Sequence, residues 1–76
     1  MKNDLLIMKT LLVKNLTVIQ RHQFITLVMQ YTDNIYRHVN TVDFLVIVEY
    51  LSLRQIFELY SRIQTAFPGA KIIAQN

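Results

Sequence analysis

The chain has 76 residues, of which 53% are hydrophobic and 17% are charged, and its formal net charge is +3. This composition fits one small domain and excludes intrinsic disorder, because the chain has enough apolar side chains to form a core. The absence of cysteine excludes a disulfide scaffold, a thiolate metal site and a thiol nucleophile. No apolar run is long enough to span a membrane, and the start of the chain lacks the features of a signal peptide. We therefore expect a cytoplasmic protein.

The excess of basic residues lies in the first half of the chain, in residues 1–41, whereas residues 42–76 carry as many acids as bases. A basic half can attract nucleic acid or another acidic partner. The bases are scattered, however, and no basic run occurs. A solvated, mildly basic surface is therefore the simpler interpretation.

The first half of the chain predicts a strand, a helix and a second strand. Residues 11–14 are a strand candidate. Thr17 and Gln20 then have the spacing of a capping box, and the apolar residues that follow predict a helix through Tyr31. Residues 35–39 alternate as a strand does. Residues 1–7 fit this pattern poorly, so we expect an N-terminal extension or the start of an edge strand there, ahead of a single domain at 8–76.

The second half repeats this order more clearly. Residues 44–50 form a short apolar run that is rich in β-branched and aromatic side chains, which predicts a strand buried on both faces. Ser52 and Gln55 again have capping-box spacing. Apolar residues recur at helical spacing until Pro68-Gly69, which ends the helix. Residues 70–74 predict a closing strand.

The order β-α-β-β-α-β predicts an α+β fold, namely a ferredoxin-like plait in which a four-stranded antiparallel sheet carries two helices on one face. We expect the first and third strands to be central and parallel, joined by right-handed crossovers. The alternative is a small all-α bundle, with helices over residues 4–14 and 42–67. The β-branched residues at 42 and 46–48 argue against it, because such side chains are crowded in helices.

The predicted third strand is apolar on both faces, although the open face of an antiparallel sheet is usually polar. An uncovered apolar patch marks an interaction site, and a second copy of the chain is a common cover. We therefore expect a homodimer or a tight heteromer. The alternate side chains expected in the interface are Phe44, Val46, Val48 and Tyr50. The other face of the strand holds Leu45, Ile47 and Glu49. The competing interpretation is that central strands of small domains are simply apolar.

The sequence offers little for catalysis or for a cofactor. His22 and His38 lack the close spacing of a metal site, and each follows an arginine. Gly69 is the only glycine, which excludes the glycine-rich phosphate loops and the nucleophile elbow. We expect no metal, no cofactor and no enzymatic activity, unless a site forms only between subunits.

A nucleic-acid-binding module is the alternative function. Plaits that bind RNA stack bases on strand aromatics, and Tyr36, Phe44 and Tyr50 lie in predicted strands. The glycine- and aromatic-rich signature of such modules is missing. The basic contacts expected in this alternative are Lys14, Arg37, His38 and Lys71. The preferred hypothesis is a small regulatory, adaptor or inhibitor protein that binds itself and another protein.

Overall fold

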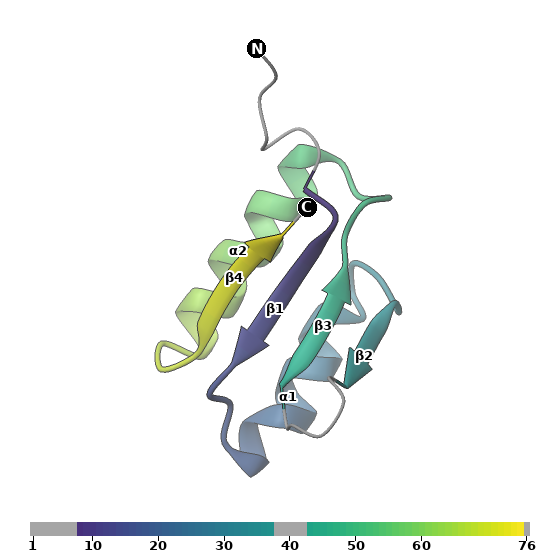
Figure 1. The fold of residues 1–76 in the computed structure, drawn as a ribbon. Helices are drawn as coiled ribbons and strands as arrows, with labels where there is room; N and C mark the ends of the chain where they lie inside the picture. The colour runs from purple at the N-terminus through teal and green to yellow at the C-terminus, as the bar shows by residue number, and fades with distance from the viewer. Residues whose placement is uncertain (1–7, 38–42, 76) are drawn as a thin grey trace.

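Six elements follow one another in the order β-α-β-β-α-β in the part of the chain that the computed structural model describes, residues 8–37 and 43–75 (Figure 1). The elements are β1 (Thr10–Lys14), α1 (Val18–Val28), β2 (Ile35–Arg37), β3 (Phe44–Ile47), α2 (Leu53–Ala66) and β4 (Lys71–Gln75). The protein is therefore α+β, as predicted, and the all-α alternative is wrong. The prediction for residues 1–7 lies outside the described residues.

The four strands form one sheet in the order β2-β3-β1-β4, and every pair of neighbours is antiparallel. The prediction that β1 and β3 are central is confirmed, but they run antiparallel and not parallel. The reason lies in the two helical connections. Each helix returns the chain so that the next strand runs parallel to the one before the helix, and a third strand lies between them. β3 occupies that gap between β1 and β2, and β1 occupies it between β3 and β4.

Both helices begin at the predicted capping boxes. The Thr17 hydroxyl accepts a hydrogen bond from the Gln20 backbone N–H at 3.2 Å, and the Gln20 side chain accepts one from the Thr17 N–H at 3.0 Å. Ser52 and Gln55 make the same reciprocal pair at 3.1 and 2.9 Å. These bonds satisfy backbone donors that the first turn of a helix leaves without partners.

No helix in the described ranges is both long and apolar enough to cross a membrane.

Two elements are shorter than predicted. Helix α1 ends at Val28, and Tyr31 belongs to the following turn, where its backbone N–H bonds to the carbonyl of Val28. Strand β3 ends at Ile47, since the backbone N–H of Leu51 bonds back to the carbonyl of Val48 and turns the chain away from the sheet.

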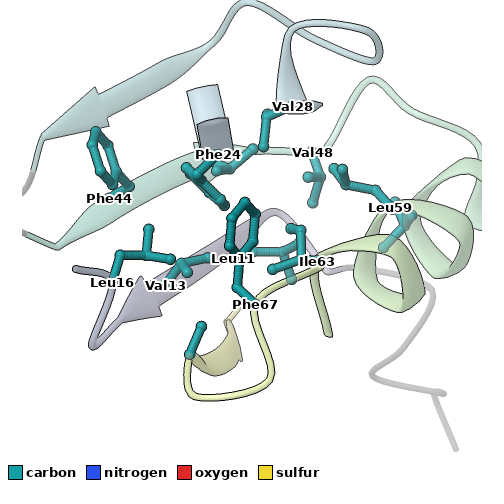
Figure 2. Packing of buried hydrophobic residues seen from close by; sticks show 13 residues of the cluster. Leu11, Val13, Leu16, Phe24, Val28, Phe44, Val48, Leu59, Ile63 and Phe67 are labelled. Atoms are coloured by element: carbon teal, nitrogen blue, oxygen red, sulfur yellow. The ribbon is translucent and has the colours of Figure 1, made fainter. Parts of the chain in front are cut away.

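The core lies between the sheet and the two helices, which cover the same face of the sheet (Figure 1). Phe24 lies at its centre, with its ring centroid 5.3 Å from that of Phe44 and 6.1 Å from that of Phe67 (Figure 2). No polar or charged residue is buried within the described part of the chain. The buried residues are Leu11, Val13, Leu16, Phe24, Val28, Phe44, Val46, Val48, Ile56, Leu59, Ile63, Phe67 and Ala70.

Polar side chains join α2 to the turn that follows α1. The Tyr31 hydroxyl donates to the Glu58 carboxylate at 2.8 Å. One Arg62 nitrogen donates to the Gln30 side-chain oxygen and to the Tyr31 hydroxyl, each at 3.0 Å, and the guanidinium lies 5.6 Å from the centre of the Tyr31 ring. The side of α2 that carries Glu58 and Arg62 therefore faces the turn at the end of α1.

Candidate functional site

None of the residues that the structure describes covers the sheet face opposite the helices, and we call it the open face. Successive residues of a strand point to opposite faces. Leu11 and Val13 are buried under the helices, so the residues that alternate with them, and their partners in register, face outwards. The open face consists of Thr10, Leu12 and Lys14 on β1, Tyr36 on β2, Leu45 and Ile47 on β3, and Lys71, Ile73 and Gln75 on β4.

A continuous apolar row crosses the middle of the open face. The strand register pairs Tyr36 with Leu45, Leu45 with Leu12, and Leu12 with Ile73. The three aliphatic residues are half-buried, and Tyr36 is 56% exposed. Four strands at about 4.8 Å spacing make this apolar row roughly 19 Å wide. Ile47 borders the row on β3.

Polar side chains lie at both ends of the open face. At one end Lys14 is directly opposite Lys71, an arrangement of like charges that destabilises a sheet. Asp43 precedes Phe44, the partner of Val13, so it falls in the same row as Lys14 and leaves that end with one net positive charge. At the other end Thr10 is opposite Gln75, and its hydroxyl donates to the Gln75 side-chain oxygen at 3.3 Å.

The structure corrects the face on which the expected interface residues lie. Phe44, Val46 and Val48 are in the core under the helices, and Figure 2 shows Phe44 and Val48 there. Tyr50 is 81% exposed and lies in the turn after β3, outside the sheet. The expected set therefore does not form one surface. Both sets of alternate side chains in β3 are apolar, and the helices cover the set that was assigned to the interface.

A sequence signal for the correct face did exist. The only acids beside this strand, Asp43 and Glu49, fall in the same alternation as Leu45 and Ile47. An acidic side chain at a strand end favours the solvent side, because burial of an unpaired charge is costly. The apolar open-face residues that the sequence analysis did not assign to a protein interface are Leu12, Tyr36, Leu45, Ile47 and Ile73.

The structure brings together only part of the basic set that was expected to contact nucleic acid. Lys14 and Lys71 are neighbours on the open face. Arg37 is exposed at the end of β2, where it alternates with Tyr36 and so belongs to the opposite face of that strand. His38 lies outside the described residues.

Neither a metal-binding cluster among the described residues nor a similarity to a known protein indicates a site other than the open face. Among residues 8–37 and 43–75, no three His, Asp or Glu side chains cluster as a metal ion would require. His22 is exposed on α1. No protein-family model matches the chain, and no significant match to a curated protein or to a solved structure is found.

Proposed function

We propose that this chain is a ferredoxin-like plait and a small, cytoplasmic, non-enzymatic protein-binding module of the regulatory, adaptor or inhibitor type. It contacts another protein through the open face and works as a homodimer. The apolar row of Tyr36, Leu45, Leu12 and Ile73 carries this proposal. An apolar band that is exposed on a sheet and bordered by polar residues is typical of a protein contact surface.

The charges at the lysine end of the open face specify the partner further. Lys14 and Lys71 are adjacent and of like sign, and the whole chain carries +3. A partner that presents an apolar patch bordered by an acidic group complements this end, and such complementarity steers encounter and fixes orientation. We therefore propose that the open face binds a different protein, through an apolar patch that is bordered by an acidic group.

The side chains of the central strands favour a protein over a nucleic acid. Single-stranded nucleic acids bind sheets by stacking bases on aromatic rings. The open-face residues on β1 and β3 include Leu12, Leu45 and Ile47, which are aliphatic and provide no such platform. Tyr36 offers one ring, on the edge strand β2. A nucleic-acid-binding module therefore has weaker support than a protein-binding one.

Photo-crosslinking in the cells that express the chain tests this proposal. A photo-reactive benzoylphenylalanine replaces Tyr36, whose ring is exposed on the open face. The matched control carries it at Val18, which is exposed on the helix side of the molecule. We expect an adduct with one distinct protein from position 36 and none with that protein from position 18. The double substitution Lys14→Glu and Lys71→Glu removes most of the adduct, because it reverses the charge beside the apolar row.

Three other outcomes would contradict the proposal. An adduct of twice the mass of the chain assigns the open face to a second copy. An adduct that ribonuclease or deoxyribonuclease degrades assigns it to nucleic acid. Equal crosslinking from positions 36 and 18, or none from either, means that the open face has no protein partner.

A further inference from the structure

The strand β4 is an edge of the sheet without the usual protection against pairing. Among the described residues, 8–37 and 43–75, the order β2-β3-β1-β4 gives β4 a single neighbouring strand. It is five residues long, and only Lys71, its first residue, is charged. The opposite edge, β2, has three residues and ends in Arg37. Short length and charge protect edge strands from pairing with other chains, so β4 is the edge that is available for pairing.

The hydrogen-bond pattern shows which backbone groups of β4 point away from the sheet. The Ile47 N–H bonds to the carbonyl of Asn34 on the β2 side, so Phe44 and Val46 bond to β1 instead. Their partners in β1, Leu11 and Val13, therefore bond to β3. The alternate residues of β1 bond to β4, because hydrogen-bonding direction alternates along an antiparallel strand. Their partners are Lys71, Ile73 and Gln75. The backbone N–H and C=O groups of Ile72 and Ala74 therefore point outwards at the edge.

An exposed apolar stripe lies on α2 beside this edge. Leu53, Phe57 and Tyr60 are spaced by four and three residues, which places them on one side of the helix, and they are 36%, 51% and 37% exposed. We call these three residues the outer stripe. Helical geometry places it on the side of α2 opposite Arg62, which bonds to the turn at the end of α1. Helix α2 lies behind β4, and α1 lies behind the other half of the sheet (Figure 1). The outer stripe therefore borders the β4 edge.

We propose that a second copy of this chain covers both features at once, by antiparallel pairing of β4 with β4 of the partner around a two-fold axis perpendicular to the sheet. The register centred on Ile73 pairs all five residues of the strand. It sets Lys71 opposite the partner's Gln75 and so keeps the two lysines apart. It also brings together the outward groups of Ile72 and Ala74. This axis places both α2 helices on the same face of the joined sheet, where the two outer stripes meet.

The size of the contact predicts a dimer that dissociates on dilution. The paired edge is about 17 Å long, since five residues rise roughly 3.4 Å each. The half-exposed ring of Phe57 contributes about 100 Å² of apolar surface, from the roughly 200 Å² of an aromatic side chain. Such an interface falls at or below the lower end of the range for stable complexes, about 1,200 Å² in total. This inference rests on the homodimer of the proposed function, but the pairing leaves the open face uncovered, so protein contact through that face is tested separately.

Two measurements on the full chain test the dimer. The first is the association state by sedimentation equilibrium, from micromolar to millimolar concentration, for the wild type and for Phe57→Glu. We expect the substitution to raise the dissociation constant at least 30-fold, roughly the effect of a hot-spot residue. Val18→Glu is the matched control, because Val18 is an exposed apolar residue of the other helix, and we expect a change within about twofold.

The second measurement is backbone hydrogen exchange at the Ile72 and Ala74 amides. We expect both amides to become protected as the protein concentration rises. Ala74→Pro is a second variant that removes one outward donor. It keeps the bonds to β1, since proline is tolerated where an edge-strand N–H faces solvent. Circular dichroism checks that Phe57→Glu and Ala74→Pro both fold.

The results separate this dimer from other assemblies. A chain that stays monomeric at millimolar concentration overturns the proposal. So does a dimer that survives Phe57→Glu and leaves the Ile72 and Ala74 amides unprotected. If that dimer is instead lost in Leu45→Lys, the second copy lies on the open face, and the proposed function fails separately from the edge pairing.

Discussion

Phe24 shows how much of this fold depends on single side chains. It is fully buried and brings together three elements, because its ring lies against Phe44 of β3 and against Phe67, the C-cap residue of α2. Tilted and edge-on ring pairs of this kind add to the burial of apolar area. The two layers of the molecule therefore meet at one aromatic cluster.

We expect Phe24→Ala to remove a large part of the free energy of unfolding. Truncation of a buried phenylalanine costs about 3–5 kcal/mol, whereas about 0.05–0.15 kcal/mol per residue gives a chain of this length roughly 4–11 kcal/mol in total. Urea denaturation followed by circular dichroism measures the loss. The control is Tyr50→Ala at an exposed position, where we expect a change within about 0.5 kcal/mol. Similar unfolding midpoints for the two variants would contradict the assignment of Phe24 to the centre of the core.

At the scale of the elements, the two helices begin with the same device. Thr17 with Gln20 and Ser52 with Gln55 form equivalent reciprocal pairs of hydrogen bonds. Each pair sets the position at which the chain leaves a strand and turns into a helix. The sequence predicts both helix starts correctly for this reason, since the signal lies within four residues and does not depend on distant contacts.

Substitution of the Ser52 cap should weaken the fold by a measurable amount. Ser52→Ala removes the acceptor of the Gln55 N–H, and we expect the free energy of unfolding to fall by about 1 kcal/mol, within the usual range of about 0.5–2 kcal/mol for N-caps. Ser61→Ala is the control, because Ser61 is exposed within the same helix and alanine favours helix there. A stability of Ser52→Ala equal to that of Ser61→Ala would mean that the cap contributes nothing.

The order of the elements was predictable from the sequence, but the face of β3 that the helices cover was not. Alternation separates two faces only when one of them is polar, and both Val46 and Leu45 are apolar. Which one is covered depends on where the helices pack, and that is a long-range property. The antiparallel direction of β1 and β3 was missed for a similar reason, because it depends on which strand enters the gap between two others. The apolar row became visible only when the strand register joined residues from all four strands.

At the scale of the whole molecule, the size of the open face links the two proposals. A sheet of four strands about 4.8 Å apart and roughly 17 Å long has a projected area of about 320 Å², well below the roughly 800 Å² that each partner of a standard complex buries. Pairing through β4 would place Ile73 opposite the partner's Ile73. The apolar row would then extend across eight strands, and the face available to a partner protein would double.

The strand order also has a consequence for the synthesis of the chain. Among the strands that the structure describes, the ribosome makes β1 first, yet β1 becomes central, and its two neighbours are β3 and β4. Neither can flank it until much later residues have left the exit tunnel, and β4 is the last of the six elements. During that time Leu11 and Val13, which are fully buried in the folded protein, remain in water. Folding in this order requires contacts between residues far apart in sequence, which slows it.

Force measurements on stalled nascent chains would detect this delay. We expect tension from folding only after Gln75 has emerged, because β1 lacks one of its neighbours before then. Chains stalled with Ala66 as the last residue outside the tunnel should show almost none, although both helices are already present. Equal tension at the two lengths would show that the first three strands fold without β4. Until β4 emerges, the nascent chain has exposed strand edges and apolar surface of the kind that chaperones recognise.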